Sequence, residues 1–193
     1  MAQSLASSVK EMEGKFSVLL EEGKPYVIRL DGCTFKKFTN GMVRPFDQRL
    51  TLAMIKTMND LVEHFNPSFA FAQSDEISLI FKGDRLREYY PYGGRVIKLC
   101  SIAAGFASAR FNAHISAFDW TDRMLEVQHR VRSSLAHFDA RVFSAPDQKA
   151  AADAVIWRHL FDCRRNAIHT IGVTHLGHRT IHALNIGEVD RVS

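Results

Sequence analysis

Apolar residues near the start of the chain recur every three or four positions over residues 5–21, which predicts an amphipathic helix. The residues that make up this apolar face are Val9, Met12, Phe16, Leu19 and Leu20. Gly23 and Pro25 are helix breakers and end the segment. The apolar run Pro25–Leu30 then predicts a buried strand that stops at the turn signal Asp31-Gly32.

The rest of the chain alternates between strand-like runs and helical spacing. Helices are predicted over residues 46–65 and 93–117, and a third helix begins at the capping residue Asp147, carries Trp157 on its core-facing side and ends at Gly172. Three more strands are predicted, at Phe69–Ala72, Ile77–Phe81 and Phe138–Phe143. The first two of these strands form a hairpin, because only four polar residues separate them.

The order of predicted elements identifies the fold class. Strand, helix, strand, strand, helix, strand, helix is a βαββαβ arrangement, which is the ferredoxin-like α+β fold with an antiparallel sheet and helices packed on it. The same arrangement builds the palm of many nucleic-acid polymerases and nucleotide cyclases. Residues 1–193 contain no repeat and no linker-like stretch, so we expect a single palm-like domain.

Composition and charge narrow the class of protein. Apolar residues make up 46% and charged residues 24% of the chain, which argues against disorder. The three cysteines are scattered, so neither a disulfide framework nor a zinc motif is predicted and a cytoplasmic location is expected. No signal peptide or membrane-spanning run is present. A net charge of +4 suits an anionic partner such as a nucleotide or RNA without establishing one.

Three carboxylates are predicted to meet at one edge of the sheet. Asp31 ends the first strand, while Asp75 and Glu76 lie in the hairpin before the third strand, and these two strands are neighbours in a βαββαβ sheet. Taken singly, each segment is most often an ordinary turn. Taken together, the carboxylates favour Mg²⁺ or Mn²⁺, and a pair of such ions is a standard device for nucleotidyl transfer. The Gly32 carbonyl is a further candidate ligand.

Candidate phosphate-binding residues lie in two places. The loop after Asp31 can offer successive backbone N–H groups and a lysine to a triphosphate. This loop consists of Gly32, Cys33, Thr34, Phe35 and Lys36. Arg95, Lys98 and Ser101 share one face of the predicted helix over residues 93–117, and Arg44 is a weaker candidate. No P-loop and no dinucleotide-binding glycine motif is present.

An ordered set of motifs resembles the histidine-tRNA guanylyltransferase family. These motifs are Arg29-Leu30-Asp31-Gly32-x-x-Phe35-Lys36-x-Phe38, Gln73-Ser74-Asp75-Glu76, Arg95-x-x-Lys98-x-x-Ser101-x-x-Ala104, Phe138-Asp139-Ala140-Arg141-Val142 and Trp157-Arg158 with Asp162. The resemblance covers roughly residues 20–185. No single motif is decisive, whereas the ordered set is specific.

The resemblance implies a polymerase-like palm that adds nucleotides to the 5′ end of tRNA. It implies two Mg²⁺ ions held by Asp31 and Asp75, with the Gly32 carbonyl and Glu76 contributing. It implies that GTP, ATP or another nucleoside triphosphate is the substrate, bound by the residues named above together with Ser74. It also implies RNA contacts from Arg29, Arg164, Arg165 and Asn166, and a homotetramer.

Two departures from the family pattern matter. True histidine-tRNA guanylyltransferases carry His-Ile-Asn-Asn where this chain has Arg164-Arg165-Asn166-Ala167 and keeps only the first Asn, so it looks like the guanylyltransferase-like branch of the family, which repairs 5′-truncated tRNA by templated addition. Family chains also usually continue further than Ser193, so this chain is either a short member or lacks a C-terminal part. A palm-type nucleotide cyclase or signalling-nucleotide synthase, and a non-catalytic RNA- or nucleotide-binding module, are the alternatives.

Overall fold

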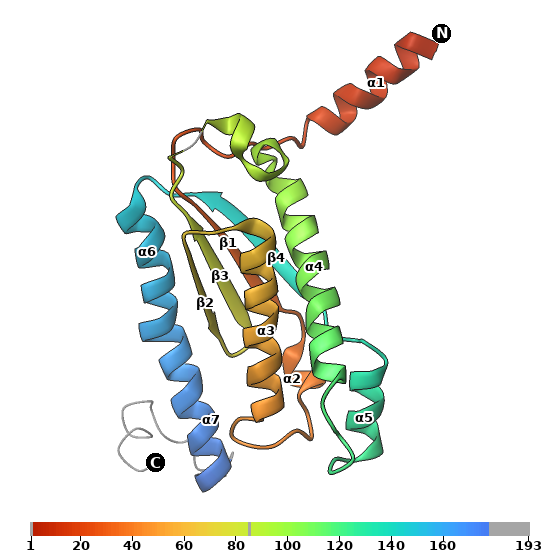
Figure 1. The fold of residues 1–193 in the computed structure, drawn as a ribbon, viewed down its shortest axis with the longest axis vertical. Helices are drawn as coiled ribbons and strands as arrows, with labels where there is room; N and C mark the ends of the chain where they lie inside the picture. The colour runs from red at the N-terminus through yellow and green to blue at the C-terminus, as the bar shows by residue number, and fades with distance from the viewer. Residues whose placement is uncertain (1, 85, 178–193) are drawn as a thin grey trace.

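The protein contains a four-stranded antiparallel sheet with helices on both faces (Figure 1). The computed structural model describes residues 2–84 and 86–177. The strands are β1 (Tyr26–Gly32), β2 (Phe69–Gln73), β3 (Glu76–Phe81) and β4 (Phe138–Ser144), in the order β2-β3-β1-β4. The two strands β1 and β3 are central neighbours, which confirms the βαββαβ, palm-like arrangement expected from the sequence.

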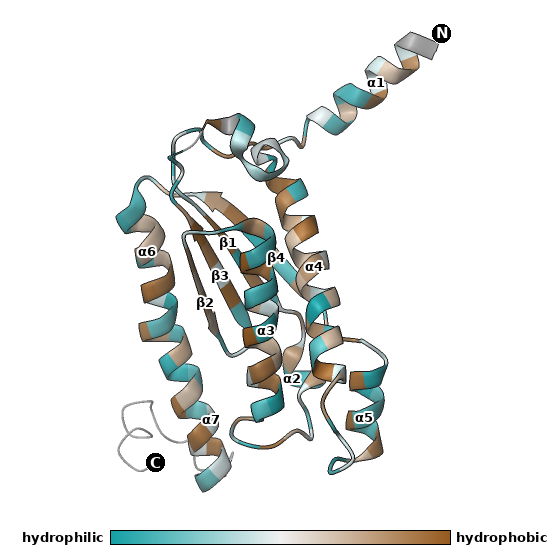
Figure 2. Cartoon of the chain, viewed as in Figure 1, coloured by the Kyte–Doolittle hydropathy of each residue, from teal (hydrophilic) through white to brown (hydrophobic). Residues whose placement is uncertain are grey.

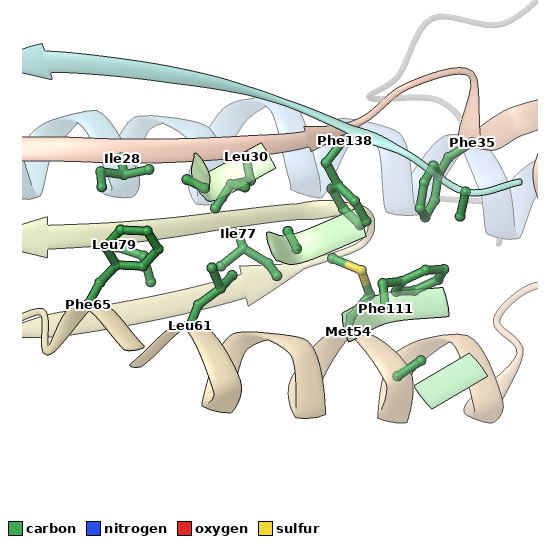
Figure 3. Packing of buried hydrophobic residues seen from close by; sticks show 14 of the residues in the cluster. Ile28, Leu30, Phe35, Met54, Leu61, Phe65, Ile77, Leu79, Phe111 and Phe138 are labelled. Atoms are coloured by element: carbon green, nitrogen blue, oxygen red, sulfur yellow. The ribbon is translucent and has the colours of Figure 1, made fainter. Parts of the chain in front are cut away.

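Two long helices cover one face of this sheet. They are α3 (Gln48–Phe65) and α4 (Val96–Ser116), and they pack on the side chains of Ile28, Leu30, Ile77 and Leu79 (Figure 3). In Figure 2 the strands are coloured mostly as hydrophobic, whereas α3 and α4 alternate between hydrophobic and hydrophilic residues. At the Gly32 end of β1 the core is aromatic, because the rings of Phe35, Phe111 and Phe138 lie with centroids 5.0–5.5 Å apart.

The opposite face of the sheet is covered in part by the C-terminal helical segment. This segment runs from α6 (Gln148–Trp157) through the π-helical stretch Arg158–Cys163 into α7 (Arg164–Leu176). Ala151 of α6 packs on Val27 of β1, and Arg158 reaches Glu76 of β3. Successive residues of a strand point to opposite faces, so Val27, Arg29 and Asp31 all face this side of the sheet.

The first predicted helix differs from the observed one. Helix α1 covers Ala2–Gly14 rather than residues 5–21, and it extends away from the sheet (Figure 1). Leu19 instead forms a β-bridge with Arg95, and Leu20 is buried with its N–H donating to the Gly94 carbonyl at 2.9 Å. Because backbone pairing satisfies these groups, the helix ends earlier than the apolar spacing suggests.

The other differences concern turns and helix ends. Asp31-Gly32 is the end of a strand and not a turn. Gly172 lies buried inside α7, which ends instead at Leu176 and is followed by the capping residue Gly177 with φ +81°. Trp157 is 52% exposed and is not a core residue. The sequence did not predict four short helical elements, which are α2 (Phe35–Phe38), η1 (Arg87–Tyr89), η2 (Pro91–Gly94) and α5 (Leu125–Arg132).

Gly32 is required by the packing beneath it. A Cβ atom at this position would overlap the ring of Phe35, which is part of the aromatic core. We therefore expect Gly32→Ala to lower the free energy of unfolding by about 1–3 kcal/mol through overpacking. Thermal and denaturant unfolding measure this.

Gly105→Ala is the matched control for that substitution. Gly105 lies inside α4, and a Cβ atom added there would meet nothing within 4 Å, so alanine is expected to stabilise the helix by up to about 1 kcal/mol. Equal stability of the two variants would contradict this account of Gly32.

Within the described residues, no helix combines the length and the apolar character that crossing a membrane requires.

Candidate active site

A row of polar side chains crosses all four strands near the Gly32 end of β1. Asp31 lies directly opposite Glu76 of β3 on one side and Asp139 of β4 on the other, and Gln73 of β2 lies opposite Glu76. Directly opposed residues of antiparallel strands project from the same face, here the face away from α3 and α4. Three carboxylates and one amide therefore share a single line across the sheet.

The hairpin between β2 and β3 is attached to the end of β1. Ser74 adopts the left-handed conformation with φ 56°, and its hydroxyl donates to Asp75 Oδ1 at 3.0 Å. The backbone carbonyl of Asp75 accepts a hydrogen bond from the N–H of Gly32 at 3.0 Å. The proximity of Asp31, Asp75 and Glu76 that the strand order predicts is therefore present, and Asp139 is an additional carboxylate that the prediction did not place there.

Burial and the neighbouring carboxylates together raise the pKa of Asp31. Burial, and then the charges of Asp75, Glu76 and Asp139, raise the pKa of the Asp31 carboxyl, while the guanidinium of Arg158 acts in the opposite direction. A group in this position gains from a bound cation, because a cation stabilises its charged form.

Arg158 neutralises one member of the row. Its Nε donates to Glu76 Oε2 at 3.0 Å and its Nη1 donates to Asp162 Oδ2 at 2.5 Å. Arg158 begins the π-helical stretch, a rare conformation that is frequent at functional sites. The sequence identifies Arg158 as a motif residue without indicating its role. Only the folded chain shows that it reaches a strand more than eighty residues away.

The donor set suits a hard cation in part. Among residues 2–84 and 86–177, no group of three or more His, Cys, Asp or Glu side chains is arranged as a metal site. Asp31 and Asp75 remain as a carboxylate pair next to the Gly32 carbonyl, and burial together with the charges of Asp75, Glu76 and Asp139 raises the pKa of Asp31. Two carboxylates and a carbonyl, completed by substrate phosphate oxygens, are typical of Mg²⁺ sites.

Only part of the loop that is predicted to bind triphosphate is accessible to a ligand. The side chain of Phe35 is buried in the aromatic core and cannot contact a ligand, whereas Thr34 and Lys36 are exposed. The thiol of Cys33 donates to Asp139 Oδ2 at 3.6 Å, and its N–H donates to the His137 carbonyl at 2.9 Å. The second half of the expected loop is the helical turn α2, which begins at Phe35.

Arg44 and Ser74 are exposed. Arg44 lies in the loop that precedes α3, and the Ser74 hydroxyl donates to the Asp75 carboxylate as described above.

Arg95, Lys98 and Ser101 lie at the other end of the sheet. Arg95 forms a backbone β-bridge with Leu19, next to the start of β1. The Nε of Arg95 donates to the Tyr92 carbonyl at 3.2 Å. The length of β1, seven residues, corresponds to roughly 20 Å between its ends. Within one chain, the structure therefore does not bring these three residues together with the carboxylates. Their shared helix face was visible in the sequence, but the direction in which α4 runs along the sheet was not.

The candidate RNA-binding residues fall into two groups. Arg164, Arg165 and Asn166 are exposed at the start of α7, and Arg165 forms an ion pair with Asp162 at 3.0 Å. Arg29 lies on β1, two residues before Asp31, and faces the same side of the sheet. The two groups are linked to the carboxylate row through Asp162, Arg158 and β1.

Comparison with protein families gives one match that spans most of the chain. A family model described as tRNAHis guanylyltransferase matches residues 6–146. An uncharacterised protein of Acanthamoeba polyphaga mimivirus is 32% identical over an alignment of 198 positions, which covers 95% of this chain and 67% of the viral protein.

Solved structures show the same fold. A bacterial tRNA(His) guanylyltransferase-like protein in complex with ATP is 27% identical, with a TM-score of 0.81 over 96% of this chain and 75% of that protein. A bacterial protein of the same description in complex with GTP is 28% identical, with a TM-score of 0.75 over 89% and 77%. The tRNA(His) guanylyltransferase of Saccharomyces cerevisiae, 22% identical, resembles this chain in fold with a TM-score of 0.69 over 91% and 72%.

Proposed function

This chain belongs to the tRNAHis guanylyltransferase family of nucleotidyltransferases, and we propose that it adds nucleotides in the 3′–5′ direction to the 5′ end of tRNA. The observation that carries the proposal is the placement of Asp31 against Glu76, with Asp75 attached through its carbonyl to Gly32. The proximity of these three carboxylates at one edge of the sheet supports the proposal.

We infer that the physiological reaction is templated repair of 5′-truncated tRNA. The motif His-Ile-Asn-Asn of true histidine-tRNA guanylyltransferases is replaced here by Arg164-Arg165-Asn166-Ala167, which supports the guanylyltransferase-like branch. The matched bacterial proteins of that description are in complex with ATP and GTP, which supports nucleoside triphosphates as substrates here.

In the proposed reaction the nucleophile belongs to the substrate. The 3′-hydroxyl of the incoming nucleotide attacks the α-phosphorus at the tRNA 5′ end, and a new P–O bond forms. The bond to the leaving group breaks, which releases pyrophosphate from a 5′-triphosphate or AMP from an end activated by ATP. Two Mg²⁺ ions, when bound, would favour the ionised hydroxyl and stabilise charge on phosphate oxygens.

The chain's own groups hold and shape this site. Asp31 and Asp75 would hold the ions, with the Gly32 carbonyl and Glu76 contributing. Arg158 holds Glu76 and Asp162 in place, and so limits the repulsion on Asp31. Thr34, Lys36 and Arg44 are exposed in or just after the loop that follows Gly32 and can contact triphosphate oxygens.

We further propose that residues 1–193 act as one catalytic domain, that the active form is a tetramer and that the protein works in the cytoplasm. A single sheet with one main core supports the first of these. The other two rest on family membership alone.

The test is 5′-end extension of a tRNA that lacks its first nucleotide, with Mg²⁺ and each nucleoside triphosphate in turn. We expect only the nucleotide that pairs with the opposite strand to be added, and we expect EDTA to stop the reaction. Equal addition of all four nucleotides would contradict templated repair, and production of cyclic or dinucleotide products without RNA would favour a cyclase.

Activity is expected to fall at acid pH because a proton competes with the cation for Asp31. The pKa of Asp31 is raised, so its charged form is present above that raised pKa and is lost as the pH falls through it. Arg158 is the group that opposes this shift. We therefore expect Arg158→Gln to move the acidic limb of the pH–rate profile to higher pH and to raise the Mg²⁺ concentration needed at half-maximal rate.

Lys149→Gln is the control for that experiment, because Lys149 forms its ion pair with the exposed Asp153 on α6, away from the carboxylate row. An acidic limb that stays in place or moves to lower pH in Arg158→Gln would show that Arg158 does not act on Asp31.

A further inference from the structure

Two arginines lie directly opposite one another beside the carboxylate row. Arg29 of β1 is the register partner of Arg141 of β4, and the two lie one row away from Asp31 and Asp139 along the same strands. Register partners on neighbouring strands have Cβ atoms about 5 Å apart and project from the same face. Two guanidinium groups therefore share a small area of the sheet next to the proposed site.

This pair has no compensating charge in direct contact. Among the described residues, neither Arg29 nor Arg141 forms an ion pair or a side-chain hydrogen bond, although Asp31 and Asp139 lie only two residues away along their strands. Like charges placed directly opposite each other destabilise a sheet. A pair that costs stability in the free protein is explained if an anion binds between the two groups.

The surface above the arginines is open. Arg141 and Asp139 are exposed, Arg29 is half-buried, and Phe143, the next residue of β4 on this face, is 37% exposed. The C-terminal helical segment contacts the carboxylate row on the other half of the sheet, at β2 and β3, where Arg158 binds Glu76 and His159 Nδ1 lies 2.8 Å from Gln73 Oε1. This part of the β1–β4 half of the face is therefore accessible to a ligand.

The position of the arginine pair along β1 favours a phosphate of the RNA as the anion. Asp31 separates the arginine pair from the loop that begins at Gly32, and that loop is the proposed triphosphate-binding segment. A step of two residues along a strand is roughly 6.7 Å, so a group bound by the arginines lies close to the reacting centre but on the far side from the loop. The second substrate, an RNA strand with its phosphates, is expected to approach there.

We propose that Arg29 and Arg141 form an anion site that binds a backbone phosphate of the RNA substrate next to its reacting 5′ end. The inference rests on the proposed function and deepens it, by assigning Arg141 a role in substrate binding. Guanidinium groups suit this task because each presents several donors in a fixed plane to phosphate oxygens.

The test compares Arg141→Gln and Arg141→Lys with the wild-type protein. Binding of 5′-phosphorylated, truncated tRNA is measured by fluorescence anisotropy over a range of salt concentrations, without Mg²⁺ or nucleotide. We expect Arg141→Gln to weaken RNA binding about tenfold and to lower the slope of log K against log salt by about one. Arg141→Lys keeps the charge but not the planar fork, so its affinity should lie between the two.

Two further readouts separate this role from others. The KM for the nucleoside triphosphate is expected to stay within about twofold, because the anion is RNA phosphate. The melting temperature of unliganded Arg141→Gln is expected to equal or exceed that of the wild type, since a like-charge pair has been removed. Arg132→Gln is the control, because Arg132 is exposed on α5. This helix packs on α4, which covers the face of the sheet opposite to the arginine pair.

Three results would overturn the proposal. They are an unchanged RNA affinity and salt slope, a raised KM for nucleotide with normal RNA binding, and a clearly lowered melting temperature. The second would assign the anion site to the free triphosphate, and the third would make Arg141 a structural residue. Because the binding arm needs no turnover, a wild-type protein that binds RNA through Arg141 but adds no nucleotide would refute only the proposed function.

Discussion

Replacing Asp75 with alanine is expected to reduce the rate of nucleotide addition at least about 100-fold, with little effect on folding. Removal of one group that stabilises a transition-state charge typically costs a factor of this size. Within the described chain, the Asp75 carboxylate accepts a side-chain hydrogen bond from the neighbouring Ser74 hydroxyl alone, so it contributes little to packing. The carbonyl that anchors Gly32 is backbone and survives the substitution.

Single-turnover rates over a range of Mg²⁺ concentrations measure this effect. The loss is expected in the rate at saturating nucleotide and not in tRNA affinity. Asp84→Ala is the matched control, because Asp84 is an exposed aspartate in the segment that follows β3, at the other end of that strand. Addition at full, metal-dependent rate by Asp75→Ala would show that the carboxylate row is not the catalytic site.

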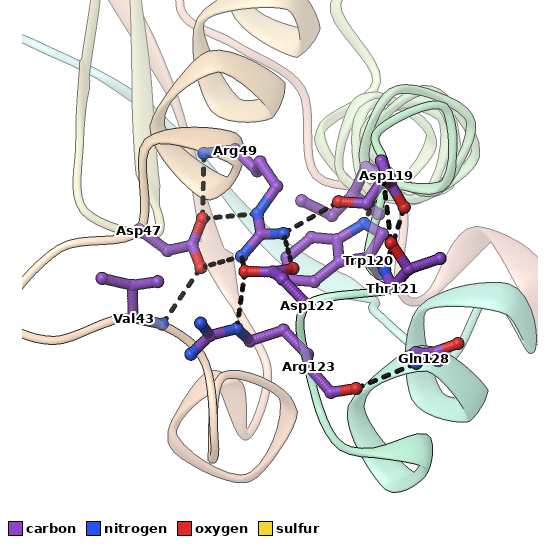
Figure 4. Close-up of polar contacts among 10 residues, drawn as sticks. Val43, Asp47, Arg49, Asp119, Trp120, Thr121, Asp122, Arg123 and Gln128 are labelled. Carbon is purple, nitrogen blue, oxygen red and sulfur yellow. Dashed lines mark hydrogen bonds and ion pairs between the residues drawn. The ribbon is translucent and has the colours of Figure 1, made fainter.

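Removal of Arg49 is expected to produce the largest loss of stability. Asp47, whose side chain is only 3% exposed, caps α3 by accepting from the Arg49 N–H at 3.0 Å, and it also accepts from the Val43 N–H at 3.0 Å (Figure 4). The Arg49 side chain binds both oxygens of Asp47 at 2.9 Å, donates to Asp122, and lies 3.9 Å above the Trp120 ring. One arginine thus joins α3 to the segment after α4.

Without that arginine, a buried carboxylate is left with backbone donors alone. We expect Arg49→Ala to lower the free energy of unfolding by about 3–5 kcal/mol, the usual cost of breaking one side of a buried ion pair. For a chain of this length that corresponds to a fall of roughly 10 °C in melting temperature. Arg123→Ala is the control, because the ion pair of Arg123 is with the 51% exposed Asp122, and such a pair is worth at most about 1 kcal/mol.

The pH dependence gives an independent check. Burial alone would raise the pKa of Asp47, but the hydrogen bonds from Arg49 and Val43 outweigh it and hold the pKa below its ordinary value. This contribution is present above the unfolded-state pKa and is lost as the pH falls through the folded-state pKa. The stability difference between Arg49→Ala and the wild type should therefore shrink under acid conditions. A difference independent of pH would contradict the ion-pair account.

Much of the sheet could be predicted because its strands are short apolar runs with clear ends. Phe69–Ala72 and Ile77–Phe81 match β2 and β3 to within one residue, and the strand order then places Asp31 against Glu76. The strand order alone predicts that Asp31 and Glu76 lie close together, since β1 and β3 are central neighbours in a βαββαβ sheet.

Other features depend on long-range contacts that local spacing cannot show. The apolar residues Leu19 and Leu20 suit a helix face, but pairing with the segment at Arg95 makes them extended. Phe35 lies in a loop-like sequence, yet its ring completes the aromatic core with Phe111 and Phe138. The separation of Arg95, Lys98 and Ser101 from the carboxylates likewise follows from how α4 lies on the sheet.

The register between β1 and β4 could not be predicted from the sequence either. Asp139 is recognisable as part of a motif, but its position beside Asp31 depends on which residues of β1 and β4 are partners. The same register places Arg141 against Arg29. A shift of β4 by one residue would turn the side chains of Asp139 and Arg141 to the other face of the sheet.

The most direct measurement of the central claim follows the γ-phosphate of the incoming nucleotide. The pairing nucleoside triphosphate, labelled at its γ-phosphorus, is incubated with truncated tRNA, Mg²⁺ and the protein. In 3′–5′ addition the 3′-hydroxyl of that nucleotide attacks the tRNA end, so its own triphosphate stays attached, and we expect the label in an RNA one nucleotide longer. Lengthened RNA without label, with all of the γ-phosphate released as pyrophosphate, would contradict growth at the 5′ end.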